Sequence, residues 1–316
     1  MRRVLPFLLV AACSHRASAP KDAALETSVV DASDDVVDAS IEEAAPKIEL
    51  PRGGREFFPT YRLVGYCGTP GGAPALGRLA GNLDKQAKAI EGYAAQYTAG
   101  DRKTMPVFEL IVVVVTGLPG PDNKFRRRVP DNVVDDYLKA ARDAKAVLLL
   151  NIQPGHSDFM TEIHHYEKYL HEPDIGLALD PEWALDPKDT KVIPGKEYGS
   201  ITGAALNEVG ELLAGIVEKD DLPEKLLVFH QVNNWVLRKE EEITAHKGVV
   251  LVKSVDGLGP AGTKVKTYNW LMKTAPEFVH PGFKLFFDED TQIGHHLMSP
   301  KEVLGLTPVP EYVMYE

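Results

Sequence analysis

Short, continuously apolar runs alternate with longer amphipathic stretches from about residue 56 to the end of the chain. Continuous runs rich in branched residues are typical of parallel strands buried on both faces, and they predict strands at 61–67, 107–115, 146–152, 175–179, 225–230, 249–255, 284–287 and 311–315. The longer stretches have the helical period and predict helices at 82–98, 131–144, 158–171, 202–219, 234–244 and 261–274, with a short one after Ser299. Such alternation is typical of βα units around a parallel sheet.

Eight strands in about 260 residues have the size and rhythm of a single (β/α)8 barrel of the TIM type. The alternative is an open, doubly wound sheet, which gathers its polar residues at one switch point. In this sequence polar residues follow almost every predicted strand, around the whole cycle. We therefore predict one α/β barrel domain over residues 56–316.

The N-terminus has the pattern of a secretory signal peptide. Arg2 and Arg3 precede an apolar run over residues 4–12, and Cys13 follows at once. The run is too short for a permanent membrane helix, which needs about 20 apolar residues. The sequence predicts a signal peptide over residues 1–12.

The end of this segment, Val10-Ala11-Ala12-Cys13, resembles the lipobox of bacterial lipoproteins. The resemblance implies cleavage before Cys13, acylation of Cys13 with chains such as palmitate, and a membrane anchor in the bacterial cell envelope. It leaves open whether the inner or the outer membrane is used. The other interpretation is an ordinary signal peptide that happens to contain a cysteine.

Residues 13–55 are predicted to be a disordered acidic tether. Residues 22–45 contain eight acidic residues and no basic or aromatic ones, so they cannot bury enough apolar surface to offset the entropy of ordering. Part of the net charge of −11 comes from this segment. Because no basic stripe with interleaved aromatic residues occurs, nucleic acid is not an expected partner. With Cys13 acylated, Cys67 has no partner and is expected in the core.

Polar side chains stand within or just after most of the predicted strands. In a barrel these positions meet at the C-terminal mouth, where active sites lie. One buried polar residue means little, but recurrence on most strands indicates a site. The candidate substrate-binding residues are Tyr66, Glu109, Gln153, Trp183, His230, Gln231, Asp256 and Asp288.

The fourth strand ends in Asp180-Pro181-Glu182-Trp183. On an extended chain Asp180 and Glu182 point to the same side, and two neighbouring carboxyl groups raise the pKa of one of them. A carboxyl group with a raised pKa protonates a glycosidic oxygen, while its neighbour steadies an oxocarbenium-like centre. We predict Glu182 and Asp180 as the catalytic pair, with Trp183 as a stacking surface for a sugar ring.

This run resembles the Asp-x-Glu end of the fourth strand in family 18 chitinases and family 25 lysozymes. The resemblance implies that Glu182 matches the catalytic acid and Asp180 its supporting carboxylate. The fuller chitinase run is not present, since apolar residues separate Asp174 from Asp180. More broadly, the segments 108–111, 151–155, 180–183 and 229–231 resemble a group of secreted or lipid-anchored bacterial barrel proteins. That resemblance implies the fold and an envelope setting, without a reaction.

Two other functions fit the same residues. A metal-dependent hydrolase, such as a phosphodiesterase, would use Asp180, Glu182, His230, Asp256 and Asp288 as ligands. No tight metal-binding spacing of histidines supports it, so no metal site and no cofactor are assigned. The second alternative is a non-catalytic barrel that binds a glycan or a partner protein at its mouth.

Overall fold

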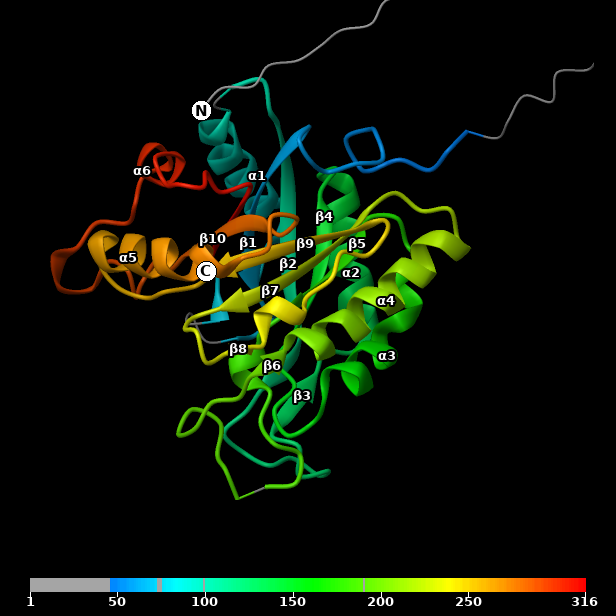
Figure 1. Ribbon diagram of the computed structural model, residues 1–316. Helices are drawn as coiled ribbons and strands as arrows, with labels where there is room; N and C mark the ends of the chain where they lie inside the picture. The colour runs from blue at the N-terminus through cyan, green and yellow to red at the C-terminus, as the bar shows by residue number, and fades with distance from the viewer. Residues whose placement is uncertain (1–45, 73–75, 99, 190) are drawn as a thin grey trace, which may run out of the picture. The chain divides into compact units, whose positions relative to one another are not determined.

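The computed structural model describes residues 46–72, 76–98, 100–189 and 191–316 (Figure 1). The predicted signal peptide, Cys13 and most of the predicted tether lie outside the described residues. No helix among the described residues is both long enough and apolar enough to span a membrane.

Eight parallel strands close into a barrel, as the sequence predicted, with helices around the outside (Figure 1). In spatial order they are β1 (Tyr61–Gly68), β2 (Lys103–Val115), β4 (Val147–Ile152), β5 (Ile175–Leu179), β7 (Lys225–Gln231), β9 (Val249–Val255), β10 (His280–Leu285) and β11 (Tyr312–Tyr315). The barrel closes because β1 pairs with β11 on one side and with β2 on the other. A short strand, β3 (Arg126–Arg128), adds antiparallel to the end of β2.

Within the described residues, six α-helices connect the strands, and most coincide with the predicted ranges. They are α1 (Leu83–Ala94), α2 (Asp131–Asp143), α3 (Phe159–Leu170), α4 (Gly203–Lys219), α5 (Ala261–Leu271) and α6 (Pro300–Leu304). Polar residues begin several of them: the side chains of Asn82, Asp158 and Thr202 each accept a hydrogen bond from a backbone N–H of the first turn. Ser299 and Glu302 form a capping box at the start of α6.

The predicted helix at 234–244 is wrong. This segment holds a two-residue strand, β8 (Leu237–Arg238), and a 3-10 turn at Glu240–Glu242. Lys239 between them has φ 55°, a left-handed conformation that interrupts any helix. Instead β8 pairs with β6 (Ile201–Thr202), which precedes α4, and the pair forms a small sheet beside the barrel.

The strand predicted at 284–287 begins earlier, at His280. The pattern missed its first residues because Pro281 and Gly282 are depleted in strands. Proline has no N–H to donate to a ladder, and its position at the start of β10 is one of the places where a strand accepts it.

Apart from an irregularity in β2 between Ile111 and Val113, residues along the strands alternate between an inner and an outer side of the barrel. Along β7, Leu226 and Val228 belong to the core inside the barrel, while Leu227 and Phe229 pack outward against the helices. Cys67 belongs to the inner core, as expected, and burial raises the pKa of its thiol well above its ordinary value. Because of this alternation, only polar residues at inward positions of the strands can face the mouth of the barrel.

The segment 46–60 closes the N-terminal end of the barrel, so the domain begins about ten residues earlier than predicted. Leu50 and Phe57 are buried in the inner core. The Tyr61 hydroxyl donates to the carbonyl oxygens of Arg52 and Gly53. The acidic bias that predicted a tether ends before Pro46, and from there on apolar side chains have a surface to pack on.

We expect residues 46–55 to be needed for full stability. A chain that begins at Glu56 loses buried Leu50, worth about 2 kcal/mol, and the hydrogen bonds of Arg52 and Arg55, worth about 1 kcal/mol each. The thermal midpoint should fall by roughly 8–16 °C, at 2–4 °C per kcal/mol. A chain that begins at Pro46 is the control and should match the full chain; equal midpoints for both would show that the segment does not stabilise the barrel.

Candidate active site

The C-terminal half of the barrel interior is polar, in contrast to the apolar half below it. Six buried side chains and one part-buried one, Glu316, face this region from seven successive places around the barrel: Glu109, Asn151, Asp180, His230, Asp256, Lys284 and Glu316. Each stands at an inward position of its strand or just past the strand's end. We call these seven residues the polar floor.

His230 occupies the middle of the polar floor. Its Nδ1 lies 2.8 Å from one carboxylate oxygen of Asp256, and its Nε2 lies 3.1 Å from Glu109 and 3.8 Å from Asp180. Burial opposes a charge on the ring, but the carboxylates of Asp256 and Glu109 outweigh it and raise the pKa of His230 well above its ordinary value. The ring is therefore an imidazolium at neutral pH. Ser254 supports it by donating to Asp256 at 2.9 Å.

Glu109 is the deepest carboxylate of the floor. Burial alone would raise its pKa, but His230, Lys284 and the Tyr312 hydroxyl hold the pKa of Glu109 well below its usual range. Tyr312 donates a hydrogen bond to its Oε2. With these partners Glu109 stays ionised, so it serves as an anchor for His230 and is no proton donor.

Two amides hold Asp180 in place. The Gln153 side chain donates to Oδ2 at 2.9 Å, and the Asn151 side chain donates to Oδ1 at 3.2 Å and to Glu109 at 2.9 Å. Gln153 is itself fixed, since its Oε1 accepts from the backbone N–H of Val115. Asp180 is thus an oriented acceptor at the edge of the cavity.

Lys284 forms the second cationic point of the floor. Its Nζ lies 2.5 Å from a carboxylate oxygen of Glu316 and 3.4 Å from Asp256. Burial lowers the pKa of a lysine, but these two carboxylates reverse the effect and raise the pKa of Lys284 well above its ordinary value. His230 and Lys284 together hold the pKa of Asp256 below its usual range despite its burial.

Glu182 differs from every other carboxyl group of the floor's surroundings because its Oε2 is buried and has no hydrogen-bond partner among the described residues. The residue is 9 % exposed. Burial first, and then the charges of Asp180 and Asp256, raise the pKa of Glu182 well above its ordinary value. The chain here is not extended as predicted, since Pro181–Trp183 forms a 3-10 turn after Asp180. Both carboxyl groups nevertheless line one cavity.

This cavity, the mouth cavity, has a volume of about 430 Å³ and lies above the polar floor. Polar residues form its base, namely Gln153, Asp180, Glu182, Asp256, Lys284 and Glu316. Its walls are largely aromatic: the rings of Trp183 and Tyr198 lie 5.6 Å apart, and those of Tyr198 and Trp235 lie 6.0 Å apart. Phe286 adds a further ring. Carboxyl groups beneath aromatic walls suit a ring with an apolar face and polar edges.

Three of the predicted binding residues lie elsewhere. Tyr66 faces outward and packs against Tyr93, Phe287 and Tyr315, because its inward neighbours on β1 are Gly65 and Cys67. Gln231 also faces outward, because the inward position belongs to His230, and its amide donates to Asn233.

The third, Asp288, is exposed and pairs with Arg78. It lies past the end of β10, beyond the positions that face the barrel interior.

The remaining candidates lie at or below the mouth cavity: Gln153, Trp183 and Asp256 line it, and Glu109 and His230 stand in the floor. The sequence pattern missed Lys284, Glu316, Tyr198, Trp235 and Phe286. A lysine inside an apolar strand was a usable signal for Lys284. The aromatic pair Tyr198 and Trp235 comes from loops and carried no such signal.

The ligand set of the metal-dependent alternative is not assembled. Asp288 lies away from the other four residues, and both ring nitrogens of His230 already face carboxylates. Over the part of the chain that the structure describes, no group of three or more His, Cys, Asp or Glu side chains is arranged to hold a metal ion.

No family model and no curated protein matches the chain. Among solved structures, it is similar to a hyperthermophilic endo-β-1,4-glucanase in complex with substrate, at 11 % identity and a TM-score of 0.35 over 73 % of this chain and 80 % of the other.

Proposed function

We propose that the protein is a glycoside hydrolase whose active site is the mouth cavity, with Glu182 as the general acid. The observation that carries the proposal is the Glu182 carboxyl: it is buried, its Oε2 has no hydrogen-bond partner among the described residues, and its pKa is raised. A carboxyl group in this state keeps its proton to higher pH than an ordinary glutamate, and its Oε2 has no partner among the described residues. It is therefore free to protonate the oxygen of a glycosidic bond.

The polar floor supplies the complementary charge. Four carboxyl groups of the floor, those of Glu109, Asp180, Asp256 and Glu316, face two cations, His230 and Lys284. The surplus of negative charge stabilises the positive charge that develops on a sugar ring as its glycosidic bond breaks. Asp180, held by two amides, is the carboxylate that we assign to this role or to the orientation of the nucleophile.

The same surplus of negative charge restricts the class of sugar that can bind. An anionic sugar such as a uronate would be repelled by the floor, whereas a neutral or amino sugar would not. The aromatic walls at Trp183, Tyr198 and Trp235 provide surfaces against which the apolar face of a sugar ring packs. A first screen should therefore use neutral and amino-sugar glycans, including chitin fragments and peptidoglycan.

We expect Asp180→Asn to lower the rate and to move the alkaline limb of the pH–rate profile toward lower pH. Activity requires protonated Glu182, so it falls as the pH rises through the pKa of Glu182. Removing the like charge of Asp180 lowers that pKa, and the decline begins earlier. The measurement is the rate against pH on a cleaved glycan, with exposed Asp143→Asn as the control. An unmoved alkaline limb would contradict the coupling of the two groups.

A non-catalytic barrel that binds a glycan at the same mouth is the second candidate, and the aromatic walls favour it as much as they favour the enzyme. Glycan binding without turnover by the full chain, in the presence of intact Glu182, would support binding alone.

We also propose that the protein is anchored in the bacterial cell envelope through lipid chains on Cys13. The support is the sequence Val10-Ala11-Ala12-Cys13 after a basic and apolar segment. Cys13→Ser should release the protein from the membrane fraction and abolish its labelling by a radiolabelled fatty acid. Cys67→Ser is the control that should keep the label. Wild-type protein without label would overturn the proposal.

A further inference from the structure

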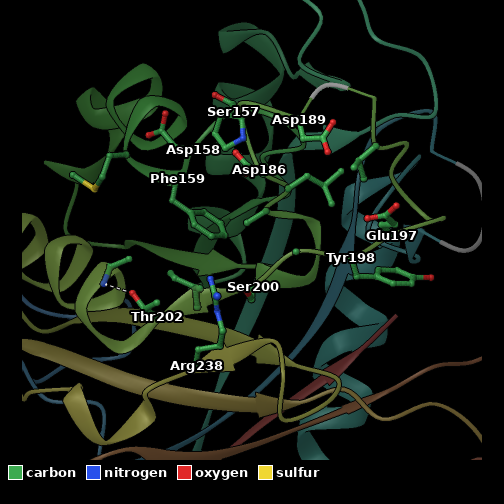
Figure 2. A pocket seen from close by; sticks show the side chains of 18 of the residues that line it. Ser157, Asp158, Phe159, Asp186, Asp189, Glu197, Tyr198, Ser200, Thr202 and Arg238 are labelled. Carbon is green, nitrogen blue, oxygen red and sulfur yellow. Dashed lines mark hydrogen bonds between the residues drawn. The ribbon is translucent and has the colours of Figure 1, made fainter.

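A second cavity lies beside the mouth cavity, and the mechanism proposed above does not use it. Its volume is about 680 Å³, larger than that of the mouth cavity (Figure 2). Its walls come from the start of α3, the loop residues 184–187, 189, 192 and 197–200, β6, the first turns of α4 and Arg238 of β8.

Tyr198 belongs to the walls of both cavities. It is 53 % exposed and stands between Trp183 and Trp235 in the aromatic row of the mouth cavity. Figure 2 shows its ring at the side of the second cavity, next to Glu197. Of the three rings in this row, only that of Tyr198 also lines the second cavity.

The wall between the cavities is tied directly to the general acid. The backbone N–H of Gly199 donates to the carbonyl oxygen of Glu182 at 2.6 Å. A Cβ on residue 199 would lie 1.8 Å from the carbonyl oxygen of Ala184, so the loop passes this turn at a distance that only glycine allows. Gly199 lines the second cavity and is hydrogen-bonded to Glu182, so it is the one residue between a ligand there and the turn that carries Glu182.

The loop that forms the second cavity is also anchored on its other side. His156 is buried, and its ring nitrogens lie 2.8 Å from the carbonyl oxygen of Asp186 and 2.7 Å from that of Val192. With anchors at His156 and at Gly199, the walls of the cavity are formed before any ligand arrives. Preformed walls reduce the ordering cost of binding.

The lining carries the groups that bind sugars. Hydroxyls of Ser200 and Thr202, the guanidinium of Arg238 and carboxylates such as Glu197 offer donors and acceptors for sugar hydroxyls, and Tyr198 and Phe159 offer ring faces (Figure 2). We propose that the second cavity is a subsite that binds further sugar units of the glycan whose glycosidic bond lies in the mouth cavity. The substrate is then an oligosaccharide or polysaccharide that runs across Tyr198. This inference rests on the proposed function.

Binding in the absence of turnover tests it. In the Glu182→Gln background, calorimetric titration with β-1,4-linked glucose and N-acetylglucosamine oligosaccharides, from the disaccharide to the hexasaccharide, should show affinity that rises with length. Arg238→Ala removes a charged donor, and Ala205→Trp fills the cavity from the first turn of α4. Each should weaken binding of the longest oligosaccharides about tenfold and leave the disaccharide unchanged. Exposed Arg127→Ala, on β3, is the matched control and should change neither.

The outcomes separate this inference from the proposed function. Affinity that does not rise with length, or variants that weaken short and long oligosaccharides equally, would overturn the subsite. Failure of every oligosaccharide to bind would overturn both proposals. Length-dependent binding that is lost in Arg238→Ala, together with full turnover by Glu182→Gln, would support the subsite and overturn the assignment of the acid.

Discussion

Glu182→Gln should lower turnover of a cleaved glycan by about 10²–10⁴-fold, the contribution typical of a positioned general acid. Glutamine keeps the shape of the side chain but has no titrating proton, so the step that protonates the leaving oxygen is lost. The ratio of initial rates for the variant and the wild type at neutral pH measures the effect. Substrate affinity should change little, because the other walls of the mouth cavity remain.

Exposed Glu218→Gln on α4 is the control and should turn over the glycan at the wild-type rate. Full turnover by Glu182→Gln would show that another group supplies the proton.

The same Glu182→Gln variant should be more stable than the wild type above pH 4.5, the ordinary pKa of a glutamate. The raised pKa of Glu182 in the folded state means that folding binds a proton there, and the associated stability is lost as the pH rises.

Lys284→Met should cost about 3–5 kcal/mol in the free energy of unfolding at neutral pH. The lysine is buried between the carboxylates of Asp256 and Glu316, and removing one partner of a buried ion pair leaves the other charge without compensation. Urea denaturation of both proteins measures the difference. Lys247→Met, at a side chain that is 92 % exposed, should cost little.

The pH dependence of the Lys284→Met variant follows from the same pairs. Without the ammonium group the pKa values of Asp256 and Glu316 rise, so the deficit should be largest at alkaline pH and shrink as the pH falls and these groups bind protons. Adding Glu316→Gln should restore part of the stability, because one uncompensated charge is removed. A deficit that does not change with pH, and that Glu316→Gln does not relieve, would indicate a packing defect instead.

The barrel was predictable because its signal is repeated eight times along the chain. Buried parallel strands are continuously apolar, and such runs recur with helices between them. The prediction of a short helix at 234–244 is wrong because the conformation of this segment depends on a tertiary contact. Leu237 pairs with Ile201, and no local sequence pattern encodes that pairing. Local patterns therefore predicted the repeated elements and missed the excursions between them.

The candidate site was only partly predictable, and the side-chain alternation explains why. The sequence pattern marks every polar residue at a strand end as a candidate, whichever way it faces. It therefore marks Tyr66 and Gln231, although both point outward. Their neighbours Cys67 and His230 point inward, and only the register of the strands shows this orientation. An error in the start of β10 made Lys284 look like the first residue of a strand when it is an inward residue of the floor.

The protonation state of Glu182 is the most direct test of the central claim. In protein labelled with carbon-13 at the glutamate side-chain carboxyl, the resonance that disappears in Glu182→Gln identifies this group, and its chemical shift is followed against pH. We predict a midpoint well above 4.5, the ordinary value for glutamate. A midpoint at or below 4.5 would mean that Glu182 is ionised at neutral pH, and it would contradict its proposed role as the acid.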